Sequence, residues 1–187
     1  MDQQKILTIA FLSPTDTDHW VNRLTGRMST HPFCHVELFF ESMNQCFSIV
    51  WGETACFRSK NLSNPNYRLV SLAVSSKEYD RCLDFCRSTS SHKLAFDDIG
   101  MWQSWLPPAC VCCCDSASQA KGRTFCSKIV TEALQFAGVR EVEHLLPAST
   151  TPSTLFQAVS TSPRVLCSGV PVKRHALTML MPPSRLG

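Results

Sequence analysis

The sequence predicts an α+β domain in which an antiparallel sheet packs against one helix that carries a cysteine at its first turn. Residues 33–51 combine two apolar runs with a short polar turn between them, which is the pattern of a hairpin. Residues 124–138 place apolar side chains at helical spacing and end in a glycine, as many helices do. Apolar runs of strand length at 6–12 and 67–74 supply further members of the sheet.

Length and charge limit the classes of protein to consider. The chain has 187 residues, enough for one domain, which we place at 1–175 with a disordered tail at 176–187. The formal net charge is only +3 and no long Lys/Arg run occurs, so we expect no nucleic-acid partner. No apolar run reaches the ~18 residues of a membrane span. We expect no transmembrane segment, whereas contact with a membrane surface stays open.

Cysteine usage favours the cell interior. The chain contains 11 cysteines, an odd number, and Cys112, Cys113 and Cys114 are consecutive. Adjacent cysteines are poor disulfide partners for each other on steric grounds. The first apolar run, residues 6–12, is short, and we expect it to be a first strand rather than a signal peptide. We therefore expect a cytoplasmic, intracellular protein whose thiols are mostly reduced.

The first elements are a strand, a short helix and the hairpin. Residues 6–12 are apolar and β-branched enough for a buried strand. Apolar side chains then recur at helical spacing, which predicts a short helix within residues 18–28. The hairpin is predicted to join a strand at 33–41 to one at 46–51 through the polar turn 42–45.

The hairpin prediction fixes which side chains share a face of the sheet. With the loop at 42–45, Glu41 would pair with Cys46. Side chains alternate between the two faces of a strand, so His35 and Glu37 lie on one face. Counting across the loop, Ser48 falls on that same face.

A third strand and a capped helix follow. Residues 67–74 have the composition of a strand. Ser75 and Glu78 match the spacing of a capping box, in which the serine and the glutamate cap the first turn reciprocally. Apolar side chains at helical spacing then predict a helix that runs to about Arg87.

The second half of the chain adds shorter elements around the cysteine helix. Residues 96–105 predict a short helix, and residues 109–122 have no periodic pattern, which predicts a loop. Thr151-Pro152 combines an N-cap residue with proline at the first helical position, which predicts a further short helix. Residues 165–172 predict a final strand.

Cys126 lies at the first turn of the predicted helix 124–138. A thiol there faces unpaired backbone N–H groups and the positive end of the helix dipole, and both favour the thiolate. The thiolate is the nucleophilic form of cysteine. The alternative interpretation is that Cys126 is one more buried cysteine on an apolar helix.

His35 is the best-placed candidate for a general base among the six histidines. Thiol catalysis needs a base within hydrogen-bond reach of the sulfur and a group that orients the base. His35 lies at the start of a predicted strand in an otherwise apolar segment. The alternative interpretation is a core histidine whose hydrogen bonds are satisfied locally.

Two segments together resemble a known enzyme family. Residues 33–40 are Phe-Cys-His-Val-Glu-Leu-Phe-Phe, and residues 124–134 are Thr-Phe-Cys-Ser-Lys-Ile-Val-Thr-Glu-Ala-Leu. In this order they resemble the circularly permuted branch of the NlpC-type papain-like cysteine peptidases, in which the histidine hairpin precedes the cysteine helix. The resemblance spans most of residues 6–160 and includes Leu146-Pro147 and residues 151–155.

The resemblance implies roles for individual residues. Cys126 matches the nucleophile, His35 matches the base, and the third polar position, on the strand after the histidine, falls at Ser48. A serine cannot stabilise an imidazolium by charge, as a carboxylate can. Glu37 shares the face of His35 and could take this place, whereas Glu53 would need a bulge to reach it. The third catalytic position therefore stays open among these residues.

The resemblance also implies acyl transfer from a peptide, amide or acyl-ester substrate through a thioacyl intermediate on Cys126. Backbone N–H groups around Cys126 and Ser127 would stabilise the oxyanion. Transfer to water gives a cysteine hydrolase, a peptidase or amidase, which is the function we expect. Transfer to a lipid or amine acceptor gives an acyltransferase; relatives of this branch include bacterial and viral hydrolases and lecithin retinol acyltransferase. A catalytically inactive interaction module of the same fold is a further hypothesis.

The cysteine cluster from Cys110 to Cys114 raises the question of a metal. Structural zinc usually takes its ligands as two spaced pairs of Cys or His, and no second pair with such spacing accompanies this cluster. We therefore expect neither a metal nor a cofactor. The remaining hypotheses are a loop with inert thiols beside the site and reversible acylation of these cysteines.

Overall fold

The computed structural model describes residues 3–18, 20–27, 30–105 and 122–169. Within them, six strands form one antiparallel sheet of order β4-β3-β2-β1-β5-β8. The strands are β1 (Gln4–Leu12), β2 (His35–Phe40), β3 (Gln45–Ser48), β4 (Cys56–Arg58), β5 (Tyr67–Ser75) and β8 (Val165–Gly169). The predicted α+β class with an antiparallel sheet is confirmed.

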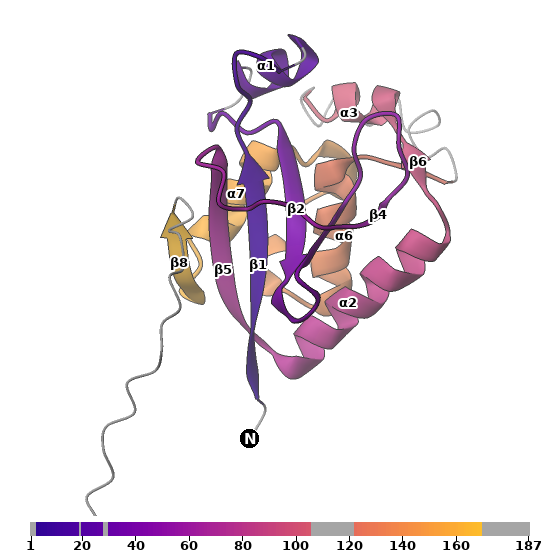
Figure 1. Cartoon of the computed structure of the whole chain (residues 1–187). Coiled ribbons are helices and arrows are strands. Elements are labelled where there is room, and N and C mark those ends of the chain that lie inside the picture. The colour runs from indigo at the N-terminus through magenta and orange to yellow at the C-terminus, as the bar shows by residue number, and fades with distance from the viewer. Residues whose placement is uncertain (1–2, 19, 28–29, 106–121, 170–187) are drawn as a thin grey trace, which may run out of the picture.

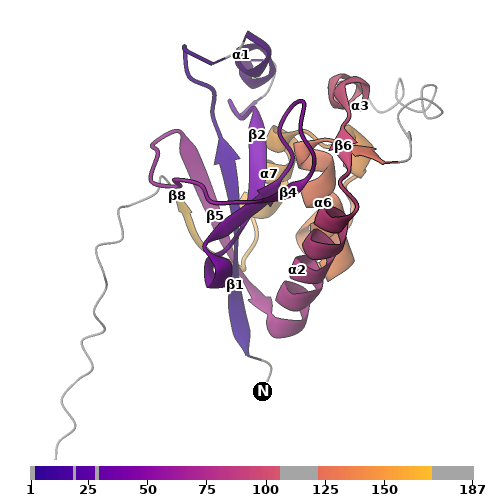
Figure 2. The same ribbon diagram turned by 45° about the vertical axis from the view of Figure 1, so that its right-hand side comes forward.

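Helices cover one face of this sheet. The helices in the described residues are α1 (Trp20–Arg27), α2 (Ser76–Ser91), α3 (Asp98–Gln103), α6 (Cys126–Ala137) and α7 (Pro152–Ser160). Figures 1 and 2 show α2, α6 and α7 together on that face, whereas α1 and α3 lie beyond one end of the sheet. The described residues also contain three 3-10 turns, which are η1 (Glu41–Met43), η2 (Arg140–Val142) and η3 (Pro147–Ser149).

Strand alternation explains why the sheet has a core face and an outer face. On β1, Leu7 and Ile9 are fully buried, whereas Thr8 between them points to the other face and its hydroxyl lies 2.9 Å from that of Ser71 on β5. The apolar stripe of α6 packs against the core face, and its members are all buried as the helical spacing predicted. They are Ile129, Val130, Ala133, Leu134 and Ala137.

The hairpin forms, but its predicted register is wrong. Phe40 pairs with Gln45, and Phe39 pairs with Cys46, the residue predicted to face Glu41. The loop begins one residue earlier because η1 is followed by Asn44 in the left-handed conformation (φ 51°), and asparagine tolerates that conformation better than most residues. This change moves the partner of Cys46 by two residues, from Glu41 to Phe39. Because side chains alternate between faces with a period of two, each side chain keeps its predicted face.

Several elements differ from the prediction in extent. β3 ends at Ser48 rather than Trp51, and the short edge strand β4 was not predicted. A second, two-stranded parallel sheet pairs β6 (Ala95–Phe96) with β7 (Arg123–Thr124), which places the start of α3 beside the start of α6. The predicted domain boundary at 175, the tail 176–187 and most of the loop 109–122 lie outside the described residues.

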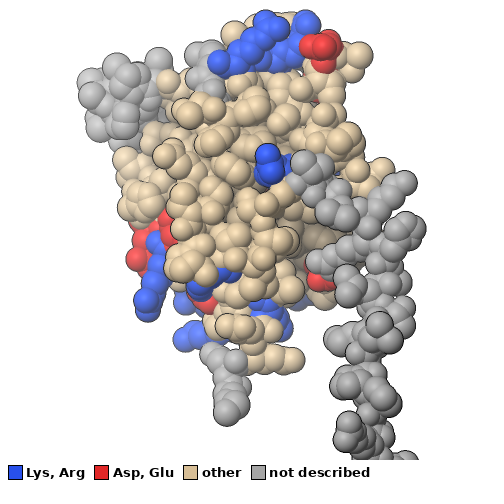
Figure 3. Space-filling model, turned by 90° about the vertical axis from the view of Figure 1, so that its left-hand side faces the viewer, with Lys and Arg blue, Asp and Glu red and all other residues tan. Residues whose placement is uncertain are grey.

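Figure 3 shows the side of the molecule that carries β8. Most charged side chains on this side lie near its two ends, and most of the described surface between them is uncharged. No helix in the described residues is both long and apolar enough to cross a membrane. The expectation that nucleic acid is not a partner stays a prediction.

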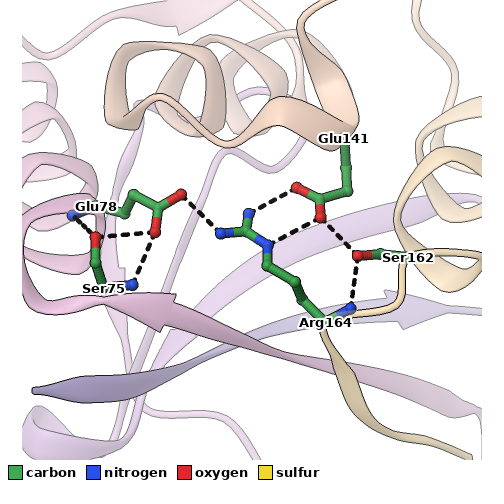
Figure 4. A network of polar contacts seen from close by, with 5 residues as sticks. All are labelled: Ser75, Glu78, Glu141, Ser162 and Arg164. Carbon is green, nitrogen blue, oxygen red and sulfur yellow. Dashed lines mark hydrogen bonds and ion pairs between the residues drawn. The ribbon is translucent and has the colours of Figure 1, made fainter.

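Arg164 joins three elements just before β8 begins (Figure 4). Its guanidinium contacts Glu78 in the capped first turn of α2 at 2.8 Å and Glu141 in η2 at 2.7 Å. Burial alone would raise the pKa of Glu141, but hydrogen bonds from Arg164 and Ser162 outweigh it and lower the pKa to about 2. The predicted capping box of Ser75 and Glu78 is confirmed.

Replacing Arg164 by methionine should lower the free energy of unfolding by about 3 kcal/mol at neutral pH, because two carboxylates lose their counter-charge. A depressed pKa stabilises the fold above the unfolded value of about 4.5 and loses that effect as the pH falls toward about 2. The difference between R164M and wild type should therefore shrink over this interval. Urea unfolding followed by circular dichroism at several pH values measures it.

The matched control is R87M, which removes an exposed arginine whose ion pair with Asp84 spans 4.0 Å. Exposed pairs of this kind contribute little, so R87M should change stability by less than about 0.5 kcal/mol. Equal effects of the two substitutions would contradict the role given to Arg164.

Candidate active site

Cys126 lies in the first turn of α6, as predicted, where it is the first helical residue, and its side chain lines a cavity. The residue before it, Phe125, is extended and provides no side-chain cap. The helical hydrogen bonds begin with the N–H of Ile129 on the carbonyl of Phe125 at 3.0 Å, so the N–H groups of Cys126 and Ser127 have no partner inside the helix. Cys126 is 6% exposed and lines a cavity of about 460 Å³.

His35 begins β2 and lines the same cavity. Its Nε2 lies 3.0 Å from Oε1 of Glu37, two residues along the same strand face. Because Nε2 is occupied by this contact, Nδ1 is the ring nitrogen left to face the sulfur. The structure therefore brings His35 and Cys126, far apart in sequence, to one cavity.

The charges around His35 favour its protonated form. Burial lowers the pKa of His35. The Cys126 sulfur, through charge and a hydrogen bond, and the Glu37 carboxylate raise the pKa by a larger amount. The net effect is a pKa of about 9, above the ordinary value of 6.5. At neutral pH the ring is an imidazolium that stands between a sulfur and a carboxylate.

Glu37 is a buried carboxylate with cationic partners. Its side chain is 1% exposed, and Lys60 brings its Nζ to 3.5 Å from Oε1. Burial raises the pKa of Glu37, but the hydrogen bond and charge of His35 and the charge of Lys60 outweigh it, so the pKa is lowered. Glu37 is therefore ionised and able to hold the ring by charge as well as by a hydrogen bond.

Ser48 lies on the predicted face, but its hydroxyl donates to the backbone carbonyl of Val36 at 2.8 Å. The contact with the imidazole comes from Glu37, one of the alternatives left open. Glu53, the other alternative, is half exposed and pairs with Arg58. The geometry thus favours Glu37 at the third position, and a catalytic role for Ser48 stays a prediction.

A second thiol, Cys34, lines the cavity next to these residues. Burial and, to a smaller extent, the charge of the nearby Cys126 sulfur together raise the pKa of Cys34 to about 12. Its Sγ lies 3.4 Å from the carbonyl of Leu12, to which the thiol donates. Cys34 is therefore a neutral thiol at physiological pH, and Cys126 is the cysteine paired with the imidazolium.

The wall of the cavity comes from loops and helices that the sequence did not link to the site. Val21, Asn22 and Thr25 come from α1, and Phe96 and Met101 come from β6 and α3. The remaining described lining residues are Leu12, Ile49, Val50, Trp51 and Lys60. Most of these side chains are apolar, so the substrate atoms near Cys126 would be partly shielded from water.

Lys60 also lines a larger hollow of about 620 Å³ on the outer face of the sheet, beneath residues 60–63. That hollow contains neither His35 nor Cys126. The smaller cavity is therefore the candidate active site. Lys60 had no local signal in the sequence, because it lies in an irregular segment and reaches Glu37 only through the fold.

No group of three or more His, Cys, Asp or Glu in the described residues is arranged to hold a metal ion. The cluster from Cys110 to Cys114 lies outside these residues. The described cysteines, seven in number, are all free thiols.

No protein-family model, curated protein or solved structure matches this chain. The function must therefore be inferred from the chemistry of the cavity itself and from the order of the motifs along the chain.

Replacing Glu37 by glutamine should lower the pKa of His35 from about 9 toward the ordinary value of about 6.5, because the ring loses an anionic neighbour. S48A should leave the pKa of His35 near 9, because the serine hydroxyl is bonded to Val36. Titration of the ring protons by NMR measures both. If the pKa of His35 fell in S48A and stayed unchanged in E37Q, the residue that acts on the ring would be Ser48 rather than Glu37.

Proposed function

We propose that the protein is a cysteine hydrolase, a peptidase or amidase, that works through a thioacyl intermediate on Cys126. The observation that carries this proposal is the single cavity in which the N-terminus of α6 meets the start of β2. It brings a thiol beside an imidazolium, and the imidazolium in turn contacts the buried carboxylate of Glu37. This is the arrangement that nucleophilic thiol catalysis requires.

The order of elements supports a fold of the permuted NlpC type. The histidine begins a hairpin strand, and the cysteine begins a later helix that packs on the same sheet. This order agrees with the resemblance of residues 33–40 and 124–134 to that branch of the papain-like peptidases.

The acylation step follows from this geometry. A lone pair of the Cys126 sulfur forms a bond to the substrate carbonyl carbon, and the π electrons of the C=O bond move to the oxygen. That electron pair then re-forms C=O and breaks the bond to the leaving group. The leaving group takes the proton from the His35 imidazolium.

Deacylation restores the thiolate. His35, now neutral, accepts a proton from water, whose oxygen bonds to the thioacyl carbon, and the carbon–sulfur bond then breaks. The products are a carboxylic acid and the thiolate–imidazolium pair. Through both steps Glu37 holds the ring in place and stabilises its charge, the role that a buried carboxylate plays toward a catalytic histidine.

Acyl transfer to a lipid or amine acceptor is the second candidate function. The apolar wall of the cavity favours it, because an apolar acceptor would bind there and displace water. The thiol, base and carboxylate serve both reactions equally, so the acceptor decides between them.

Alkylation by iodoacetamide should single out Cys126 at neutral pH, and H35A should slow it at least about tenfold, because the imidazolium no longer favours the thiolate. Peptide-level mass spectrometry gives the rate for each cysteine separately. Cys167, an exposed thiol on β8, is the internal control and should react equally fast in both proteins. Equal rates for Cys126 in wild type and H35A would argue strongly against the proposed pair.

Incubation of the enzyme with an activated ester should release free acid, and added ethanolamine should not divert the acyl group. Chromatography of the products measures the ratio of acid to amide. C126A corrects for the uncatalysed reaction with the amine. A Cys126-dependent amide as the main product would replace the hydrolase by the acyltransferase.

A further inference from the structure

Asn22 lies in the first turn of α1 and lines the cavity that contains Cys126 and His35. The helix is closely seated beside the site. A Cβ atom on Gly26, one turn further along, would lie 2.7 Å from Cγ of Pro14, so only glycine permits this approach. The hydroxyl of Thr25 also donates to the backbone carbonyl of Asn22 at 3.0 Å. The backbone around Asn22 is thus held in place.

Other polar side chains around the cavity already form ion pairs or hydrogen bonds with neighbouring groups. Lys60 faces Glu37, and the Cys34 thiol donates to the carbonyl of Leu12. The Thr25 hydroxyl is bonded to the carbonyl of Asn22 itself. Within the described part of the chain, the side-chain amide of Asn22 makes no hydrogen bond. Its N–H donors therefore remain available to a ligand in the cavity.

Attack of Cys126 on a carbonyl places a negative charge on the carbonyl oxygen. Stabilising that charge requires at least one donor beside the sulfur and preferably two. The backbone N–H of Cys126 is one, because it has no partner inside α6. The backbone N–H of Ser127 lies in the same helix turn, and a side chain from another element of the cavity wall can supply a further donor.

We infer that the side-chain amide of Asn22 donates a hydrogen bond to this oxyanion, as a catalytic residue. The inference rests on the proposed function, because an oxyanion forms only when Cys126 attacks a carbonyl. It adds a residue from α1 to a site that the sequence placed only on β2 and α6. Asn22 neither moves a proton nor forms a covalent bond in this role.

Two reactions of the same thiol separate this role from a structural one. Acylation by p-nitrophenyl acetate passes through an oxyanion and releases p-nitrophenolate. Alkylation by iodoacetamide forms a carbon–sulfur bond while iodide leaves, and no oxyanion arises. A donor to the oxyanion affects the first reaction alone, whereas damage to the pair of Cys126 and His35 affects both.

The experiment measures both rates in wild type, N22A and N22D, with N64A as the matched control for an exposed asparagine. N22A should slow acylation about 100- to 1,000-fold, the usual effect of removing one oxyanion donor, and leave alkylation of Cys126 within about twofold. N22D keeps the size of the side chain and replaces the donor by a negative charge, so it should slow acylation at least as much. N64A should change neither rate.

Acylation of N22A and N22D at the wild-type rate, or an equal loss of acylation and alkylation in both variants, would overturn the role of Asn22. A wild-type protein whose Cys126 is alkylated but never acylated would overturn the proposed function, and this inference with it.

Discussion

The burial of α6 against the core face of the sheet is the constraint on which the site depends. Each of its fully buried Ile, Leu or Val side chains contributes roughly 1.5–3 kcal/mol relative to exposure. Ser127 anchors the first turn through a 2.6 Å hydrogen bond from its hydroxyl to the carbonyl of Thr150. A helix held in this way has no freedom to slide, so Cys126 stays at the edge of the cavity.

The outer face of the sheet has to accommodate a buried charge. It carries His35 and Glu37, and a buried carboxylate must be paired with a cation or it loses its charge. His35 supplies one partner, and Lys60 from the segment after β4 supplies the other. The same contacts that make Glu37 tolerable inside the protein also orient and charge the imidazole. Stability and the proposed chemistry therefore depend on one small group of residues.

The cavity is closed by elements that belong to neither the histidine strand nor the cysteine helix. The parallel pair of β6 and β7 aligns the start of α3 with the start of α6, which brings Phe96 and Met101 to the wall. α1 approaches from the other side because Gly26 permits close contact with Pro14. An acyl group bound at Cys126 would therefore meet apolar side chains and the amide of Asn22.

The sequence by itself indicated most of the strands and helices, their faces and the candidate pair of Cys126 and His35, because these follow from local periodicity and from the order of two motifs. It also placed Glu37 on the right face, since alternation survives a change of register by two. Only the tertiary structure shows that Glu37 contacts the imidazole and that Ser48 is bonded to Val36, because both residues share the face and only distances separate them. The positions of Lys60 and Asn22 at the cavity could not be predicted from the sequence, since long-range packing alone brings irregular or distant segments to one cavity.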